Sequence, residues 1–270
     1  MCAVTVQTFA QFGQYEPWRH SLVHVQRGGL LLWVTRGQGV LHMHGVRRGF
    51  GTNNAVYIPP DHLWAVDFGR QTLGLAVALP RDLSDHFPKT ERLLRVQDAL
   101  AQSELTGLIE DMRREQQQDR PFVGEALAAQ SALIGIWLRR QIEALPPQTK
   151  PRAAERLARR YATEVARSLG TGINMAEIAA QLEVSPAHLT RVCRDTAGMT
   201  ASEIQTQPLL HEARKLLVDT KTPVKAIAAQ LGFNSAAYFT RFIQHHCGQS
   251  PRQLRQAAQH TAKPALSRRG

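Results

Sequence analysis

One sequence pattern occurs twice in the last third of the chain and constrains its fold more than any other feature. The first copy, MAEIAAQLEVSPAHLTRVCRDTAG, runs from Met175 to Gly198, and the second, VKAIAAQLGFNSAAYFTRFIQHHCG, runs from Val224 to Gly248. Both contain the string IAAQL, at 178–182 and 227–231. Because both copies keep their apolar pattern, their glycines and one arginine, each should form the same supersecondary unit.

The first copy predicts two helices separated by a tight turn. Asn174 can cap the first helix, with Glu177 in the position that a capping box requires. Ser185 can cap the second helix, and Pro186 follows at the first helical position, where its missing N–H costs nothing. The apolar stripe of the second helix is Leu189, Val192 and Cys193. Its opposite face is polar and basic and consists of Ala187, Thr190, Arg191 and Arg194.

The second copy predicts the same arrangement. Thr222 is expected to cap its first helix, Gly232 to make the turn, and Asn234 or Ser235 to cap the second helix. The inward residues are then Phe239, Phe242 and Ile243, and the outward residues are Ala236, Ala237, Thr240, Arg241 and Gln244. A helix with such an outer face fits the major groove of DNA, which is about 12 Å wide. Arg191 and Arg241 are the residues expected to contact guanine, and contact with phosphates alone is the alternative.

The basic charge of the chain lies in the half that carries the repeat. The whole chain has a formal net charge of +11, and residues 149–270 contain 18 Lys and Arg against 8 Asp and Glu. Residues 1–148 contain 15 against 14 and are therefore almost neutral. A basic domain attached to a neutral one indicates a polyanionic partner, most often nucleic acid, although a solubilising basic face would give the same count.

The segment between the two copies has a suitable length for a DNA-reading scaffold. Residues 200–219 are expected to form one helix, and about 18 residues at 1.5 Å each span roughly 27 Å. Successive major-groove segments on one side of a duplex lie about 34 Å apart. Pro208 falls inside this helix and is expected to bend it.

The first half of the chain predicts an α+β domain. Residues 1–80 contain short runs rich in β-branched, aromatic and leucine residues, separated by Gly- and Pro-containing turns, which is typical of a small barrel or sandwich. Residues 90–145 change to helical periodicity and are expected to form an antiparallel pair of helices. The apolar stripes of these helices fit either a dimerisation surface or packing against their own barrel, and both remain open here.

Domain boundaries follow from composition. Three prolines within residues 146–151 favour an extended linker, so the first domain is placed at 1–145, the second at 152–258, and a disordered tail at 259–270. No apolar run approaches the roughly 18 residues that a membrane-spanning helix needs, and no signal peptide is expected. The three cysteines are expected to be reduced thiols in a cytoplasmic protein.

Residues 152–258 resemble the DNA-binding domain of the AraC/XylS family of bacterial transcription regulators. The segments that show this resemblance are IAAQLEVSPAHLTRVCRDTAG and IAAQLGFNSAAYFTRFIQHHCGQSPRQLR. By position, the resemblance places base reading at Ala187, Thr190 and Arg191 and at Ala236, Ala237 and Arg241. The alanines suggest contacts with thymine methyl groups. The family usually has an arginine where this chain has Pro208.

The amino-terminal half is similar to the cupin-like sensor domain of the same family. The segments that carry the resemblance are Pro17–His20, LLLWVTRGQGVLHMHG and AVYIPPDHLWAV. This resemblance implies a cupin-like barrel that binds a small effector and a flanking helix that mediates a homodimer.

Several side chains of this half are candidates for an effector pocket. His42 and His44 are spaced to lie on one face of a strand, where they could contact an effector or a metal ion. The glutamate of a metal-binding cupin is absent, because Val46–Arg47–Arg48 follows, so no metal and no cofactor are expected. Trp33, Tyr57 and Trp64 could line the pocket or belong to the core. No catalytic arrangement is apparent.

The patterns indicate binding of double-stranded DNA, and the resemblance implies sequence-specific regulation of transcription in the cytoplasm, with a small-molecule effector and RNA polymerase as further expected partners. Two other functions remain open. One is a metal-dependent cupin enzyme that carries a basic domain, and the other is an architectural protein that binds DNA without sequence preference.

Overall fold

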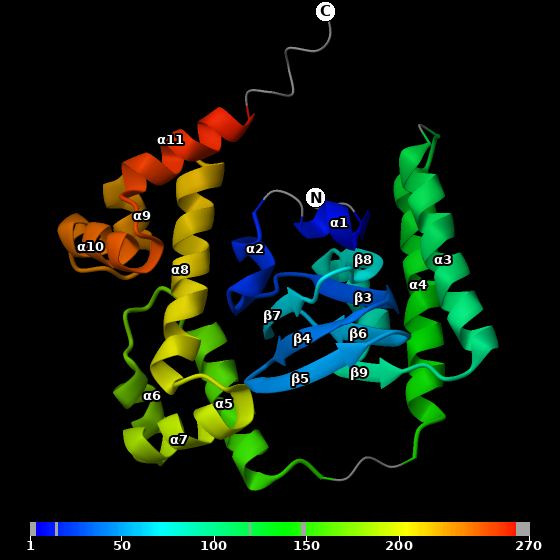
Figure 1. Cartoon of the computed structure of the whole chain (residues 1–270), viewed down its shortest axis with the longest axis horizontal. Helices are drawn as coiled ribbons and strands as arrows, with labels where there is room; N and C mark the ends of the chain where they lie inside the picture. Colours follow the sequence, from blue (N-terminus) through cyan, green and yellow to red (C-terminus); the bar gives the residue numbers. More distant parts are fainter. Residues whose placement is uncertain (1–3, 14–15, 119, 147–149, 263–270) are drawn as a thin grey trace, which may run out of the picture.

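The structure is a computed structural model that describes residues 4–13, 16–118, 120–146 and 150–262, with side chains described up to residue 258. Two antiparallel β-sheets occupy the centre of the molecule (Figure 1). One has the strand order β1-β8-β3-β6-β9 and the other the order β2-β7-β4-β5. The strands of the first are β1 (Thr5–Thr8), β8 (Leu73–Leu79), β3 (Gly29–Arg36), β6 (Asn54–Ile58) and β9 (Arg92–Arg95); those of the second are β2 (His24–Val25), β7 (Leu63–Phe68), β4 (Gln38–Met43) and β5 (Val46–Gly51).

The two sheets enclose an apolar core because side chains alternate between the faces of each strand. On β3, Leu30, Leu32 and Val34 point between the sheets, where they meet Leu41 and Trp64 from the second sheet. Leu31 and Trp33 point the other way, towards the helices that cover the five-stranded sheet. Each sheet is therefore apolar on both faces, and a second layer must cover each outer face.

Helices α3 (Ala99–Gln117) and α4 (Val123–Glu143) cover the outer face of the five-stranded sheet (Figure 1). The stripe that the sequence pattern predicted, which includes Leu105, Ile109 and Leu138, is buried against this sheet. Trp33 anchors the contact, because its Nε1 donates a hydrogen bond to Thr106 Oγ1 at 2.9 Å. The inner stripes of both helices thus pack on their own sheet.

Three parts of the amino-terminal half differ from the sequence-based expectation. β5 covers VRRGFG, a Gly-containing segment that was expected to be part of a turn; Val46 and Phe50 lie on one face of this strand and are both buried. β9 lies in the region expected to be helical, and α3 begins only after Asp98, whose side chain accepts from the N–H groups of Leu100 and Ala101. The short helices α1 (Phe9–Gly13), α2 (Trp18–Ser21) and η1 (Arg81–His86) were not predicted.

The carboxy-terminal half is helical throughout. Its helices are α5 (Ala153–Arg167), α6 (Met175–Gln181), α7 (Pro186–Ala197), α8 (Ala201–Asp219), α9 (Val224–Gln230), α10 (Ala236–Cys247) and α11 (Pro251–Ala262). α11 extends four residues beyond the expected domain end at 258, and most of the expected tail lies outside the described residues. Part of the expected linker also lies outside them, since residues 147–149 are not described. No helix in the described part of the chain is long and apolar enough to cross a membrane.

The two halves share a hydrophobic core. Val23, Leu63 and Ala65 on the outer face of the four-stranded sheet pack in one cluster with Tyr161 and Val165 of α5 and with buried residues of α6, α7 and α8. Tyr161 is fully buried, and its hydroxyl donates to the carbonyl oxygen of Ala201 at the start of α8 (2.7 Å). The four-stranded sheet is therefore covered by the helical half, as the five-stranded sheet is covered by α3 and α4.

Candidate nucleic-acid interface

The first repeat copy folds as α6, a tight turn and α7. Asn174 and Glu177 form the expected capping box, and Ser185 Oγ accepts from the N–H of His188 at 3.2 Å. Glu183 adopts a positive φ of 60° in the turn, and Gly198 ends α7 in the left-handed region. The two N-caps agree with the sequence-based expectation, and Ser185 and Gly198 fix the start and the end of α7.

The second copy repeats this geometry in α9 and α10. Ser235 caps α10 by accepting from the N–H of Tyr238 at 3.1 Å, whereas Thr222 does not cap α9, because the N-cap position is Pro223. Gly232 has a φ of +75° and lies so close to Gly170 that an added Cβ would be 2.7 Å from the carbonyl oxygen of Gly170. Glycine is therefore required in this turn for both its backbone conformation and its contact.

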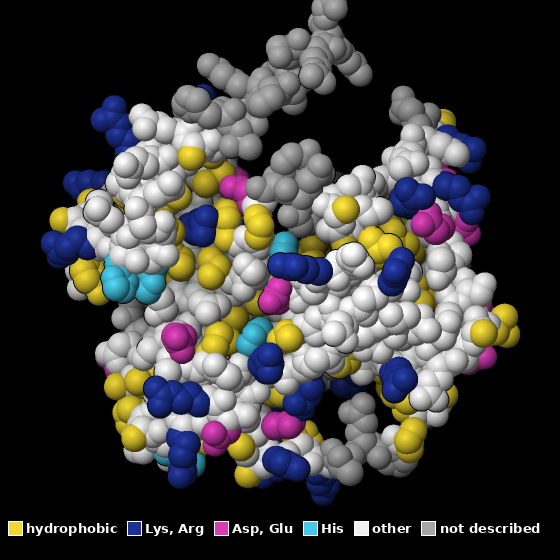
Figure 2. Space-filling model, viewed as in Figure 1, with side chains coloured by type: hydrophobic (Ala, Val, Ile, Leu, Met, Phe, Trp, Pro, Cys, Tyr) yellow, Lys and Arg dark blue, Asp and Glu magenta, His cyan; other side chains and the backbone are white. Residues whose placement is uncertain are grey.

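The outward faces of α7 and α10 contain the side chains expected to reach DNA. On α7, Ala187, Arg191 and Arg194 are exposed and Thr190 is half-buried. On α10, Ala237, Arg241 and Gln244 are exposed, and Ala236 and Thr240 are half-buried. The opposite faces are buried, with Leu189 and Cys193 on α7 and Phe239 and Ile243 on α10 fully inaccessible to solvent. Figure 2 shows Lys and Arg side chains distributed over this helical half of the molecule.

Each of the two central arginines has one neighbour that orients it. Arg191 Nη2 lies 3.1 Å from Nδ1 of His188, one turn earlier on α7. The guanidinium of Arg241 lies 5.9 Å from the ring centroid of Tyr238, which is 54% exposed. His188 and Tyr238 were not among the predicted site residues, although their spacing of three residues from each arginine is a readable signal.

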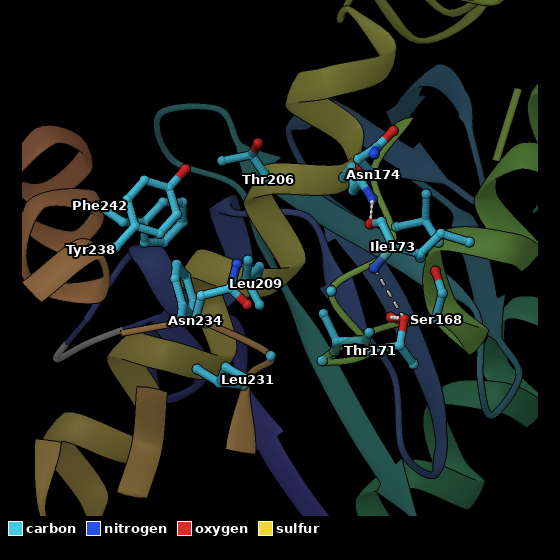
Figure 3. A pocket seen from close by; sticks show the side chains of 17 residues that line it. Ser168, Thr171, Ile173, Asn174, Thr206, Leu209, Leu231, Asn234, Tyr238 and Phe242 are labelled. Carbon is cyan, nitrogen blue, oxygen red and sulfur yellow. Dashed lines mark hydrogen bonds between the residues drawn. The ribbon is translucent and has the colours of Figure 1, made fainter. Parts of the chain in front are cut away.

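A cavity of about 480 Å³ separates the two helix-turn-helix units (Figure 3). Figure 3 shows Tyr238 and Phe242 of α10 on one side, Ile173 and Asn174 before α6 on the other, and Thr206 and Leu209 of α8 between them. Gln205 of α8 donates to the carbonyl oxygen of Ile173 at 2.7 Å. Beside this space, α8 connects the two units, and the turn at Gly232 contacts the segment at Gly170 directly.

Helix α8 is continuous from Ala201 to Asp219 with Pro208 inside it. The amino-terminal half contacts α8 on both sides of this proline. Gln207 Oε1 accepts from the N–H of Val23 at 2.9 Å, and Asp219 forms an ion pair with Arg19 at 2.6 Å. Arg27 forms an ion pair with Glu212 at 2.8 Å. The rings of His24 and His211 stack with their centroids 4.1 Å apart, and the guanidinium of Arg214 lies over the ring of Trp18.

The side chains predicted for an effector pocket are not brought together. Trp33 and Tyr57 pack in the layer between the five-stranded sheet and α3 and α4, and Trp64 lies between the two sheets. His42 and His44 do not share a strand face, because β4 ends at Met43 and His44–Gly45 forms a two-residue turn with φ angles of 46° and 85°. This is the primed turn that matches the twist of a β-hairpin.

His44 joins the two halves of the molecule. The N–H of Leu63 donates to Nδ1 of His44 at 3.3 Å, so the proton of the neutral ring is on Nε2, which donates to Thr163 Oγ1 of α5 at 2.9 Å. Burial lowers the pKa of His44 to about 3. Within the described residues, no group of three or more His, Cys, Asp or Glu side chains is arranged to hold a metal ion.

The buried histidines predict a stability that falls in mild acid. Burial lowers the pKa of His24 to about 4 and that of His211 to about 3, against about 6.5 in an unfolded chain. Since the unfolded state then binds more protons, each histidine should cost on the order of 1 kcal/mol per pH unit below about 6.5. Urea unfolding should therefore give a lower midpoint at pH 5 than at pH 7.5.

Two substitutions separate this effect from other titrations. His211→Gln should reduce the dependence of stability on pH, because it removes one buried imidazole. His24→Gln, at the ring that stacks on His211, should reduce the dependence as well. A urea midpoint that is constant from pH 7.5 to pH 5 would contradict the burial of these rings in the neutral form.

Two helix-turn-helix units with basic outer faces on one scaffold define a DNA-binding protein. A family model described as a helix-turn-helix domain matches residues 178–257. The chain is 34% identical over 85 residues to the Probable transcription factor PqrA of Proteus vulgaris, a match that covers 32% of this chain and 70% of that protein. It is 25% identical over 85 residues to the Arabinose operon regulatory protein of Escherichia coli, covering 32% and 29% of the two chains.

The chain belongs to the AraC/XylS family of transcription regulators. A further relative, the Uncharacterized HTH-type transcriptional regulator YfiF of Bacillus subtilis, is 31% identical over 84 residues, and the match spans 31% of this chain and 26% of that protein. Among solved structures, ToxT from Vibrio cholerae aligns over 94% of this chain and 96% of its own, with 13% identity and a TM-score of 0.41. Apart from PqrA, the relatives named here are matched over less than a third of their length.

Proposed function

We propose that this protein is a sequence-specific regulator of transcription that reads DNA with α7 and α10 in successive major-groove segments. The observation that carries the proposal is the pair of exposed, arginine-bearing helix faces joined by the continuous helix α8. Its 19 residues span about 28 Å, which is close to the roughly 34 Å between major-groove segments on one side of a duplex.

The proposed contacts divide into base reading and phosphate binding. Arg191 and Arg241 are proposed to donate to guanine, because both are exposed at the middle of their helices and each lies beside a neighbouring ring. Small and methyl-bearing side chains fit contacts with thymine methyl groups; they are Ala187, Thr190, Ala236, Ala237 and Thr240. Arg194 and Gln244, one turn further along, are proposed to contact the DNA backbone.

The sensor half is proposed to control this DNA-binding half in response to a small molecule. The shared core and the contacts along α8 support the control, because a change in the four-stranded sheet acts directly on helices of both units. RNA polymerase is the proposed protein partner, and the bacterial cytoplasm, at the nucleoid, is the proposed location. The proposal assigns no catalytic step to the chain.

A homodimer through the outer surface of α3 and α4 is also proposed. Their inner faces are occupied by the five-stranded sheet, but Leu133 and Leu100 remain 51% and 67% exposed on the outer surface. Exposed apolar side chains on two adjacent helices are a common basis of a self-complementary interface. Sedimentation equilibrium tests this proposal, and a monomer at micromolar concentration would refute it.

Binding measurements at a fixed salt concentration test the proposed function. Genome-wide mapping of bound sites should yield a shared motif with two half-sites about one helical turn apart. A duplex with that motif should bind at least about a thousand times more tightly than random DNA of the same length. Equal affinity for both duplexes would instead establish an architectural protein, because phosphate contacts alone do not distinguish sequences.

A further inference from the structure

The hairpin of β4 and β5 brings an arginine of the amino-terminal half to the end of α7. β5 is an edge strand of the four-stranded sheet, and the hairpin points towards α5 and α7 (Figure 1). Arg47 of β5 pairs in register with His42, which pairs in turn with Ala65. Because Ala65 belongs to the core that this sheet shares with the helical half, Arg47 lies on the sheet face that the helices cover.

The side chain of Arg47 lies beside the carboxyl end of α7. Gly198 ends this helix, and a Cβ added to it would be 3.6 Å from Cδ of Arg47, which is ordinary van der Waals contact. Gly198 follows Arg194 by four residues and Arg191 by seven, so it continues the exposed stripe that contains these two arginines. Arg47 therefore extends the basic face of α7, although it comes from the other half of the chain.

The guanidinium of Arg47 has no partner in the described part of the chain. Its side chain is exposed and forms neither an ion pair nor a hydrogen bond there. The adjacent Arg48 differs, because it pairs with Glu155 of α5 at 2.9 Å. One arginine of β5 thus joins the two halves of the molecule, and the other remains available to a partner outside the chain.

The position of Arg47 suits a phosphate of bound DNA. α7 has 12 residues and is about 18 Å long, whereas the major groove is about 12 Å wide. When such a helix is placed across the groove with Arg191 over the bases, its last turn lies beside the phosphate backbone. The partial negative charge at the carboxyl end of a helix repels phosphate, and a cation beside that end offsets the repulsion.

We propose that Arg47 binds a DNA phosphate beside the half-site that α7 reads, so that the amino-terminal half forms part of the DNA interface. Arginine is suited to this role because its planar guanidinium donates two parallel hydrogen bonds to phosphate. The contact exists only while β5 lies against α7, so DNA affinity depends directly on the docking of the two halves. The proposal rests on the proposed function, because it takes α7 as a helix in the major groove.

The salt dependence of DNA binding by the full-length protein tests this contact. Arg47→Gln should reduce the slope of log K against log salt concentration by about 0.9, the value for one phosphate contact. Since phosphates carry no sequence information, operator and random duplexes should lose the same factor in affinity. Arg36→Gln, the same change at an exposed position at the end of β3, should leave the slope unchanged. An unchanged slope in Arg47→Gln would overturn the proposal.

Ethylation interference locates the phosphate. Ethylation neutralises one phosphate at a time, so duplexes ethylated at a phosphate that the protein needs are depleted from the bound fraction. One phosphate beside the half-site affected by Arg191→Ala should interfere with binding of the wild type and not with binding of Arg47→Gln. Identical interference patterns for the two proteins would overturn the proposal, and would leave Arg47 with no role beyond the charge at the end of α7.

A substitution in the hairpin turn tests the dependence on docking. Gly45 has a φ of 85°, and a Cβ added to it would be 2.5 Å from the carbonyl oxygen of Ala158 in α5, so Gly45→Ala should displace the hairpin from the helical half. Arg47→Gln should then change the salt slope less in the Gly45→Ala background than in the wild type. Equal changes in both backgrounds would overturn the link between docking and the contact.

The contact of Arg47 and the proposed function can fail separately. If Arg241→Ala weakens operator binding while Arg47→Gln leaves the salt slope unchanged, the proposed function stands and the contact is refuted. If the wild type binds operator and random DNA equally and Arg47→Gln still lowers the slope, the contact stands and base reading is refuted.

Discussion

Arg241→Ala is expected to weaken binding to the cognate operator by roughly 5- to 150-fold, which corresponds to the loss of about 1–3 kcal/mol of base discrimination. The guanidinium is exposed on the outer face of α10 and lies against the ring of Tyr238, so its removal leaves the fold of the helix intact. Random DNA loses only one positive charge and should bind nearly as before. Competition binding at one salt concentration, with operator and random duplexes of equal length, measures both effects.

Arg36→Ala is the matched control for this experiment. It removes the same charge from an exposed position at the end of β3, on the side of the sheets away from α10 (Figure 1), and should change neither affinity. Arg191→Ala should reproduce the loss of specificity at the half-site that α7 reads. An equal loss on operator and random DNA would assign Arg241 to phosphate binding and would remove base reading from the role of α10.

Leu63→Ala is expected to destabilise the protein by about 2–5 kcal/mol, because it leaves a cavity in the core that the two halves share. Leu63 is 1% exposed and lies on the face of β7 that packs against α5. Its loss should therefore increase the rates of amide hydrogen exchange in α5 and α7, and it should lower the midpoint of urea unfolding.

Leu32→Ala provides the comparison. Leu32 is equally buried but points between the two sheets, so its substitution should cost a similar free energy while acting first on the strands. Hydrogen exchange measured by mass spectrometry, under conditions where both variants remain folded, distinguishes the two patterns. Unchanged protection of α5 and α7 in Leu63→Ala would show that the sheet does not support the DNA-binding half.

The DNA-binding half was predictable because its signals are local. Asn174 with Glu177, Ser185 before Pro186, and Gly198 and Gly248 at helix ends each specify a boundary through residues within one turn. The exposed faces of α7 and α10 followed from helical spacing alone, and the structure places all nine predicted side chains on them, exposed or half-buried. The roles of His188 and Tyr238 depend on contacts with an arginine three residues along the helix, which the charge and apolar patterns do not indicate.

The amino-terminal half was less predictable because its structure depends on distant contacts. Arg47 and Arg48 hide the alternation that makes β5 a strand, and its pairing with β4 depends on the conformation of His44. The contact of Val23 with Gln207 joins residues 184 positions apart, and no periodicity in either segment records it. The residues predicted for an effector pocket are aromatic and histidine side chains of a predicted barrel. Because helices pack on the outer face of each sheet, these side chains lie in different layers of the structure.

Pro208 has a mechanical consequence for the two DNA-reading helices. A proline inside a helix lacks one backbone hydrogen bond, so the helix bends more easily at that residue. α8 by itself is therefore not a rigid connection between the two units. The amino-terminal half contacts α8 at Gln207, just before Pro208, and at three residues after it: His211, Glu212 and Asp219. These contacts restrict bending of α8 at Pro208. The angle between α7 and α10 therefore depends on the docked amino-terminal half as well as on α8 itself.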